Sequence, residues 1–256
     1  MPQRTRLIPL LCVLALGGPT LGGCASGPEA ASPVQAPERQ LPALYQRPPE
    51  VRDPLYVADP LESTNRQLYK FNAKLDDYVL IPVVDAYEAV TPGFVRTRVS
   101  NFFLNLGEVN TFLNSVLQLR VTKAAPTLAR FVINSTVGVF GLFDVATDLE
   151  IKRENEDFGQ TLGYWGVAPG PYLVLPALGP SNLRDGVGRV ADWVAFDFVL
   201  PDGIQHNDAY AISSYTLQPI DARARVPFRY HETGSPFEYE LVRYGITKAR
   251  EVQIKE

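Results

Sequence analysis

The sequence contains few of the side chains from which most enzyme and metal sites are built. Its 256 residues include only two cysteines and two histidines, His206 and His231. Both cysteines, Cys12 and Cys24, lie near the amino terminus, so the rest of the chain has no thiolate for a disulfide or a metal centre. The sequence also lacks a nucleophile elbow, a phosphate-binding loop and a paired-histidine zinc motif. It therefore predicts a protein that is not an enzyme, with no catalytic residues, no metal site and no cofactor.

The charge balance argues against nucleic-acid binding. The chain has 24 lysines and arginines against 28 aspartates and glutamates, a net charge of -4. Proteins that bind nucleic acid through its phosphates carry an excess of positive charge. Hydrophobic residues make up 46% of the chain, which is an ordinary globular composition. We therefore expect one large folded domain or two small ones, and no nucleic acid as a partner.

The amino terminus has the pattern of a bacterial lipoprotein signal. Arg4 and Arg6 precede an apolar run over residues 7–16, and Leu21-Gly22-Gly23-Cys24 follows. The run is shorter than the ~20 residues that span a bilayer. Leu-Gly-Gly-Cys resembles the lipobox, whose cysteine receives lipid and becomes the new amino terminus. We therefore expect residues 1–23 to be a signal peptide and Cys24 to be the lipidated residue.

The segment after this cysteine is expected to be a lipidated flexible tether. Residues 24–58 are rich in proline, alanine, serine, glutamine and glutamate and show no apolar periodicity. Ala25 follows the cysteine, whereas aspartate there would resemble a signal for retention in the inner membrane. The resemblance to lipoproteins implies three acyl chains, and stable anchoring requires at least two. By this resemblance the protein is lipid-anchored in the outer membrane, on the periplasmic side.

Helical periodicity extends over most of the chain beyond the tether. Asp59-Pro60-Leu61-Glu62 has the residue order of a capping box, and Ser235-Pro236-Phe237-Glu238 repeats it. Pro82 starts or kinks a second helix, which stops at Thr91-Pro92-Gly93. Apolar residues at helical spacing predict further helices over residues 95–106, 109–117, 181–200 and 208–217, and a charged final helix after residue 235.

Two uncharged segments, residues 131–143 and 158–183, are harder to explain as soluble core. The second has the length of a membrane span, but its glycines and prolines are too frequent for a helix. Irregular backbone cannot face hydrocarbon, because each unpaired N–H or C=O group there costs several kcal/mol. We therefore expect a loop or short hairpin that is buried by protein or lies at the polar–apolar boundary. Its candidate mobile-loop residues are Gly159, Gly163, Gly166 and Gly170.

These patterns predict an all-α fold of multiple short amphipathic helices with Gly/Pro-rich apolar loops. We expect a helical body over residues 59–222 and a charged carboxyl-terminal tail with one helix over residues 223–256. Basic and acidic residues alternate along that last helix, as on a solvated face. Both projection of this helix from the body and simple packing against the body are compatible with the sequence.

The order of short motifs resembles that of the MlaA (VacJ) lipoproteins over roughly residues 55–200. The resemblance implies a ring of short helices with a polar central channel, seated in the inner leaflet of the outer membrane. It implies phospholipid as cargo, a trimeric outer-membrane porin and the periplasmic lipid shuttle MlaC as partners, and retrograde phospholipid transport that maintains lipid asymmetry. The matching motifs are Asp59-Pro60-Leu61-Glu62, Asn65-Arg66, Phe71-Asn72, Ser100-Asn101-Phe102, Asn105-Leu106, Arg130-Phe131, Asn134-Ser135, Gly138, Gly141, Asp144, Phe158-Gly159, Thr161-Leu162-Gly163, Gly166, Gly170-Pro171-Tyr172, Leu175-Pro176 and Leu183-Arg184-Asp185.

Such a conduit has a physical rationale. The charged head of a phospholipid resists entering hydrocarbon, and its tails resist leaving it at ~0.8 kcal/mol for each exposed CH₂. An apolar belt around a polar lumen satisfies both halves of the molecule. On this hypothesis the candidates for contact with the channel or with phospholipid are Glu62, Asn65, Arg66, Phe71 and Asn72. Arg66 can pair with phosphate, or it can be an ordinary helix arginine paired with Glu62 four residues before it.

Two other classes of function stay open. A structural lipoprotein that scaffolds porins without transport explains the anchor and the aromatic stripes, but not the charge-free loops. A phospholipid-cleaving enzyme would have to recruit carboxylates and His206.

Overall fold

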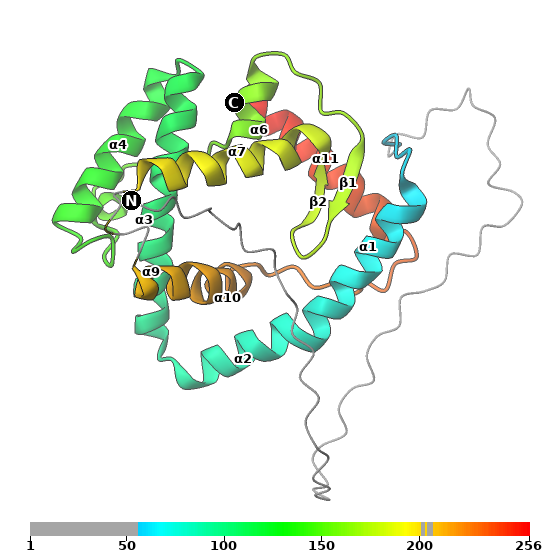
Figure 1. Ribbon diagram of the computed structural model, residues 1–256, viewed down its shortest axis with the longest axis horizontal. Coiled ribbons are helices and arrows are strands. Elements are labelled where there is room, and N and C mark those ends of the chain that lie inside the picture. The colour runs from blue at the N-terminus through cyan, green and yellow to red at the C-terminus, as the bar shows by residue number, and fades with distance from the viewer. Residues whose placement is uncertain (1–55, 201–202, 204–206) are drawn as a thin grey trace, which may run out of the picture. The chain divides into compact units, whose positions relative to one another are not determined.

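The computed structural model describes residues 56–200, 203 and 207–256. The predicted signal peptide, Cys24, nearly all of the predicted tether and His206 lie outside these residues. The described chain is mainly helical with one two-stranded antiparallel sheet, which confirms the all-α class (Figure 1). Within this range, none of the helices combines the length and the apolar character that crossing a bilayer requires.

Helices α1 (Glu62–Leu75) and α2 (Ile81–Val90) are joined end to end by a π-helical segment, η2 (Asp76–Leu80). Pro82 lies in the first turn of α2, as predicted, directly after η2, and its missing N–H removes one bond from the continuous helical ladder. The predicted cap by Asp59 is wrong, because α1 begins after Leu61 without a side-chain cap. The Asp59 carboxylate instead accepts hydrogen bonds from Asn65 Nδ2, at 2.8 Å, and from the Tyr239 hydroxyl. Tertiary contacts have replaced the local one.

Helix α3 (Gly93–Leu117) is one long helix where the periodicity predicted two. The expected break contains Gly107, but a glycine inside a helix costs only about 1 kcal/mol relative to alanine. Packing against α4 (Val121–Thr136) outweighs that cost. Asn105 donates to Ser135 Oγ at 2.9 Å, and Glu108 accepts from Arg130 Nε at 2.9 Å, so both sides of the glycine are tied to α4. Arg130 is fully buried and also reaches Asp144, which caps the short helix α5 (Val145–Asp148).

The uncharged segment 158–183 is partly helical, which corrects the expectation that no helix forms there. Its first residues form α6 (Phe158–Tyr164), because the Asp157 carboxylate caps the helix by accepting from Gln160 N at 2.9 Å. The expected hairpin follows as β1 (Tyr172–Leu175) and β2 (Gly179–Asn182), with Tyr172 opposite Asn182. Helix α7 (Leu183–Val199) starts directly after β2.

The remaining elements are α9 (Asp208–Ile212), the π-helical η3 (Ser213–Leu217), α10 (Gln218–Ala224) and α11 (Glu238–Lys255). Helix α11 packs against α6 and β2, so the final helix is part of the folded unit and does not project from it. The predicted cap by Ser235 is wrong, since α11 starts at Glu238 without a side-chain cap. The buried Glu238 carboxylate instead accepts from the Tyr69 hydroxyl at 2.6 Å.

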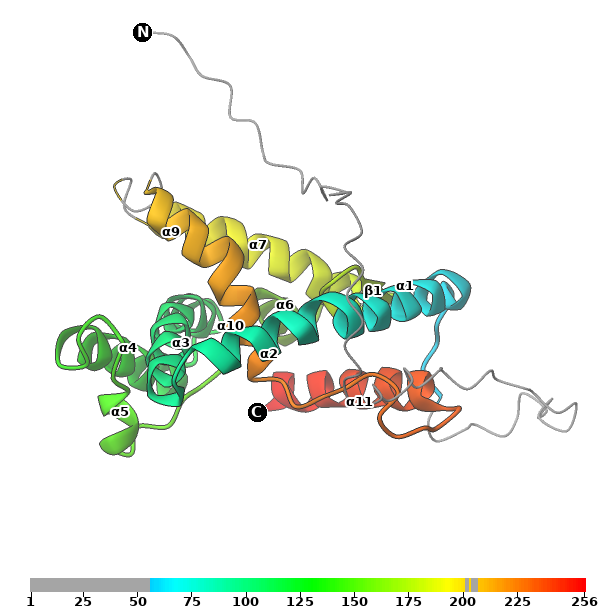
Figure 2. The same cartoon turned by 90° about the horizontal axis from the view of Figure 1, so that it is seen from below.

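Contacts among these elements form a closed circuit. Helix α2 packs against α10, α10 against α3, α3 against α7, and α7 against the β1–β2 hairpin, which packs against α1. Because α1 continues into α2, the circuit returns to its starting point (Figures 1 and 2). A small aromatic core of Tyr69, Tyr172, Val174 and Tyr239 lies where α1, the hairpin and α11 meet.

Candidate functional site

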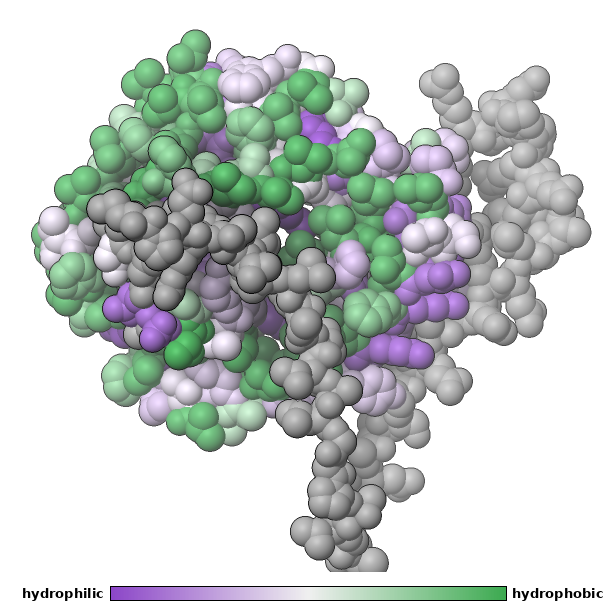
Figure 3. Space-filling view, in the orientation of Figure 1, coloured by the Kyte–Doolittle hydropathy of each residue, from purple (hydrophilic) through white to green (hydrophobic). Residues whose placement is uncertain are grey.

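The distribution of polar and apolar residues is inverted relative to an ordinary soluble domain. Among the described residues, 21 buried residues are polar or charged and only nine are hydrophobic. Many large apolar side chains lie at the surface instead, including Leu119, Phe140 and Phe198, which are 86%, 76% and 88% exposed. Figure 3 shows apolar side chains gathered over α4 and along α7. An apolar surface of this extent marks contact with lipid or with another protein.

An apolar groove of about 860 Å³ lies between α3 and α7. This volume lies within the range of ~300–1,000 Å³ that small-molecule sites occupy. Helix α3 contributes Leu113, Val116 and Leu117, and α6 contributes Phe158. Helix α7 supplies the opposite wall with Val187, Val190, Ala191, Val194, Ala195, Phe198 and Val199. Aliphatic and aromatic walls of this kind suit a hydrocarbon chain.

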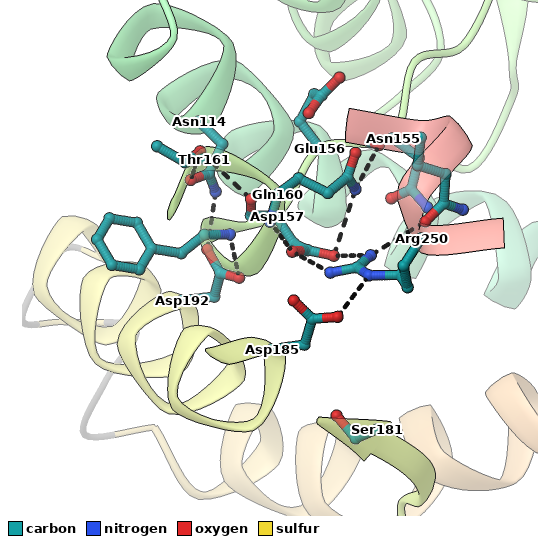
Figure 4. Close-up of polar contacts among 12 residues, drawn as sticks. Asn114, Asn155, Glu156, Asp157, Gln160, Thr161, Ser181, Asp185, Asp192 and Arg250 are labelled. Carbon is teal, nitrogen blue, oxygen red and sulfur yellow. Dashed lines mark hydrogen bonds and ion pairs between the residues drawn. The ribbon is translucent and has the colours of Figure 1, made fainter. Parts of the chain in front are cut away.

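Asn114 and Asp192 also line the groove. Figure 4 shows their polar contacts. The Asp192 carboxylate accepts from Asn114 Nδ2 at 2.8 Å and from Phe158 N at 2.9 Å. Asn114 Oδ1 in turn accepts from Thr161 Oγ1 at 2.8 Å. Burial raises the pKa of Asp192, and the two hydrogen bonds to its charged form offset only part of this effect. These bonds fix α3, α6 and α7 around the groove.

Arg250 of α11 holds the same region from the other side (Figure 4). Its guanidinium donates to both oxygens of Asp157 at 2.7 Å and to Asp185 Oδ2 at 2.8 Å. Burial opposes ionisation of both carboxylates. The hydrogen bonds and charge of Arg250, together with hydrogen bonds from Gln160 to Asp157 and from Arg184 to Asp185, outweigh it and lower the pKa of both groups. Arg250 therefore joins the cap of α6, the first turn of α7 and the final helix.

Gly159 and Gly163 were expected to lie in a mobile loop, and the structure corrects this. Both lie in α6, at positions of close packing. A Cβ atom on Gly188 of α7 would lie 2.4 Å from Gly159 N, and one on Gly163 would lie 2.6 Å from Ile254 of α11. Gly166 and Gly170 do lie in the loop between α6 and β1, with φ angles of +89° and +69°. Mobility of that loop stays a prediction.

Two of the predicted contact residues are buried structural residues of α1. Asn65 donates to the Tyr172 carbonyl at 3.0 Å and accepts from Val174 N at 2.9 Å. Asn72 donates to the Leu175 carbonyl at 2.9 Å and accepts from Ala177 N at 2.8 Å. Both side chains are almost fully buried and hold the hairpin against α1, which leaves them no face for lipid.

The other three predicted residues are more exposed. Phe71 is 51% exposed, and Arg66 and Glu62 are partly exposed. Arg66 donates to Glu62 at 2.7 Å, as predicted for an ordinary helix arginine paired four residues back. It also donates to Glu240 of α11 at 2.7 Å. Its guanidinium lies 4.3 Å from the Tyr239 ring centroid. Arg66 is therefore neutralised within the protein, and contact of these three residues with lipid stays a prediction.

Sequence reasoning missed the residues that build the groove's inner side. Asn114, Asp192 and Arg250 come from three helices far apart in the chain. One signal was present for Asn114: it interrupts the apolar stripe of residues 109–117 on the side that α3 buries. No local pattern pairs it with Asp192, because that contact depends on how α3 and α7 cross.

The sequence was compared with families of known proteins and matches one of them. The family model for the MlaA lipoprotein matches residues 57–253. An uncharacterized protein of Rickettsia felis is 37% identical over 203 residues, which cover 78% of this chain and 80% of the relative. A lipoprotein of Escherichia coli K12, named as MlaA of an intermembrane phospholipid transport system, is 33% identical over 180 residues, 66% of this chain and 67% of the relative.

A solved structure shares the fold. It is described as the structural basis for maintenance of bacterial outer membrane lipid asymmetry. The TM-score is 0.62 at 29% sequence identity, and the match covers 77% of this chain and 100% of the solved one.

Proposed function

Because the chain belongs to the MlaA lipoprotein family, we propose that it transports phospholipid and catalyses no reaction, as a protein anchored through Cys24 to the periplasmic side of the outer membrane. On this proposal it removes mislocalised phospholipid from the outer leaflet and passes it to the periplasmic shuttle MlaC, beside a trimeric porin. Lipid asymmetry is maintained as a result. The name of the Escherichia coli relative and the subject of the solved structure both support this assignment.

The main support for the proposal is that the buried residues are mostly polar while many large apolar side chains are exposed. A water-soluble scaffold has no need to expose large apolar side chains such as Phe198 while burying charged ones such as Arg130. A protein seated among lipid tails gains from both features, since its apolar surface stays out of water and its polar groups are paired inside. The groove between α3 and α7 adds a place for an acyl chain next to buried polar groups.

The deciding experiment measures outer-leaflet phospholipid in cells that lack the protein, with other asymmetry systems also disabled. Deletion should raise outer-leaflet phospholipid, and the wild-type gene should restore the low level. Cys24→Ala should fail to restore it, because the anchor is lost. No rise on deletion would count against transport.

A scaffold that only contacts porins predicts a different pattern. Val190→Asp places a charge in the groove while leaving the anchor intact. If transport is the function, this variant should still co-purify with porin but should not restore asymmetry. Restoration of asymmetry by the variant would favour scaffolding. A phospholipase would release lysolipid or fatty acid from phospholipid incubated with the purified protein, and we expect neither, with or without divalent metal.

A further inference from the structure

The groove between α3 and α7 has about the length of a single acyl chain. Its α7 wall runs from Val187 to Val199. At 1.5 Å per residue this wall is about 18 Å long, and half of the ~30 Å hydrocarbon core of a bilayer is about 15 Å thick. Ala191 and Ala195 contribute only methyl groups to the wall, so a larger side chain at either position would fill part of the groove.

The same wall is open to the side. Val190, Val194 and Phe198 line the groove and are also exposed at the surface. The apolar surface of α7 is therefore continuous with the groove. A chain that lies among lipid tails can enter it sideways without crossing water.

The polar part of the groove offers hydrogen-bond acceptors. Its polar lining residues are Asn110, Asn114 and Asp192, and none of the described residues that line it is a lysine or an arginine. Asn110 Oδ1 is buried and accepts no hydrogen bond from the described residues. The two Asp192 oxygens accept one hydrogen bond each, from Asn114 Nδ2 and Phe158 N, whereas a carboxylate can accept about four in all. A ligand that donates a hydrogen bond is therefore favoured here.

The charges around Asp192 favour a neutral donor. Three carboxylates and three guanidinium groups lie together on this side of α7, and their charges cancel. They belong to Asp157, Asp185, Asp192, Arg184, Arg189 and Arg250. A charged head group would have to give up hydration beside a cluster that is already balanced. A hydroxyl adds no charge and donates one hydrogen bond.

A lysophospholipid combines the features that the groove selects. It has one acyl chain, and a free hydroxyl stands on the glycerol carbon next to the ester of that chain. In a diacyl phospholipid a second chain replaces this hydroxyl. We propose that the groove binds a lysophospholipid, with its acyl chain along α7 and its glycerol hydroxyl donating to the acceptors of Asn110 and Asp192. The proposal rests on the proposed function and adds single-chain phospholipids to its cargo.

The test is a calorimetric titration of the full-length lipidated protein, held in an amphipathic polymer so that no detergent competes for the groove. Lauroyl-lysophosphatidylcholine carries the hydroxyl, and its methyl ether at the same oxygen keeps the chain, the phosphate and the charges. The wild type should bind the lysolipid about 10-fold more tightly than the ether, because the ether cannot donate a hydrogen bond to a charged acceptor. Equal binding of the two lipids by the wild type would overturn the proposal.

Two substitutions test the acceptors. Asn110→Leu removes one acceptor and leaves the hydrogen bonds of Asp192 with Asn114 and Phe158 in place. It should lower the preference for the lysolipid over the ether. Combining it with Asp192→Asn should lower the preference below about 3-fold, because the charge is lost as well. A preference that stays at the wild-type value in Asn110→Leu and in the double variant would overturn the proposal.

A third substitution tests the place of the chain. Ala195→Phe fills the groove and should weaken binding of the lysolipid and of the ether by at least 10-fold. The matched control is Ala125→Phe, which puts the same side chain on the exposed side of α4, outside the groove, and should bind both lipids as the wild type does. Unchanged binding in Ala195→Phe would overturn the proposal, because the chain would then lie elsewhere.

Dihexanoylphosphatidylcholine, a soluble diacyl phospholipid, separates this proposal from the proposed function. If the wild type bound it but showed no preference for the lysolipid over the ether, only the lysophospholipid site would be overturned. If the wild type bound none of the three lipids, the proposed function would fail together with the site.

Discussion

Replacing Arg250 by methionine should detach the carboxyl-terminal helix from α6 and α7. Methionine keeps part of the apolar stem of the arginine and removes the guanidinium that joins Asp157 to Asp185. Three short charge-assisted hydrogen bonds are lost. The side chain of Asp185 is 5% exposed but keeps its ion pair with Arg184 at 2.9 Å, whereas that of Asp157 is 33% exposed and loses its ion pair with Arg250.

The size of the effect follows from this burial. Breaking a buried ion pair by removing one partner costs ~3–5 kcal/mol, and we take the lower end because Arg184 still pairs with Asp185 and solvent screens part of the Asp157 contribution. For a folded unit of this size, a loss of about 3 kcal/mol corresponds to a fall in Tm of roughly 6–12 °C. The assay is thermal unfolding in detergent, followed by circular dichroism.

The pH dependence makes the prediction specific. The folded-state pKa of Asp157 and of Asp185 is lowered, so their contribution to stability is present above the unfolded pKa of ~3.9 and is lost as the pH falls through the folded pKa. The difference in Tm between wild type and variant should therefore be full at neutral pH and should shrink below about pH 4.

Lys248→Met is the matched control. Lys248 pairs with Glu251 at 2.8 Å on the same helix, but both side chains are 48% exposed. Its loss should leave the Tm close to that of the wild type, because solvent screens an exposed pair. The reasoning would be refuted if Arg250→Met cost under about 1 kcal/mol, or if its effect were the same at pH 3 as at pH 7.

Three further predictions concern packing, the hairpin and the groove. Gly188→Ala should lower the free energy of unfolding in urea by about 1–3 kcal/mol, because the new Cβ would lie 2.4 Å from Gly159 N. Gly186→Ala is the control: its Cβ would meet nothing closer than Leu175 at 3.8 Å, so it should be neutral or stabilising. Asn65→Ala removes the partner of the Tyr172 carbonyl and of Val174 N, so it should lower the free energy of unfolding by about 2–3 kcal/mol. Limited proteolysis should cut the hairpin faster, and unchanged cleavage would contradict the role of Asn65. Val194→Asp should reduce flotation of the protein with phospholipid vesicles, while Ser63→Asp on the exposed side of α1 should not.

Helical periodicity predicted most of the elements but not their ends. The apolar stripes predicted α1, α2 and α7, because each of these helices buries one face and its spacing is visible in the chain. The two capping boxes failed for a common reason. Asp59 and Glu238 are bound by side chains distant in the sequence, Tyr239 and Tyr69 respectively, and those contacts outcompete a local cap.

The candidate site was predicted less well than the fold. Composition indicated the uncharged segments, yet α6 forms within one of them despite Gly159 and Gly163, because both glycines permit close approach to neighbouring helices. Asn65 and Asn72 stand on a polar face of α1, and nothing local shows that this face is covered by the hairpin.

The closed circuit of contacts has a consequence for how the chain acquires its structure. Asn65 finds its partner Tyr172 107 residues later, and Tyr239 reaches Asp59 across 180 residues. Loop closure over such separations is slow, and the polar side chains of α1 have no hydrogen-bond partners nearby in the sequence. The contacts of α1 are therefore complete only when the last helix is available. A chain synthesised from its amino terminus would thus complete this part of its fold only after the last helix has been made.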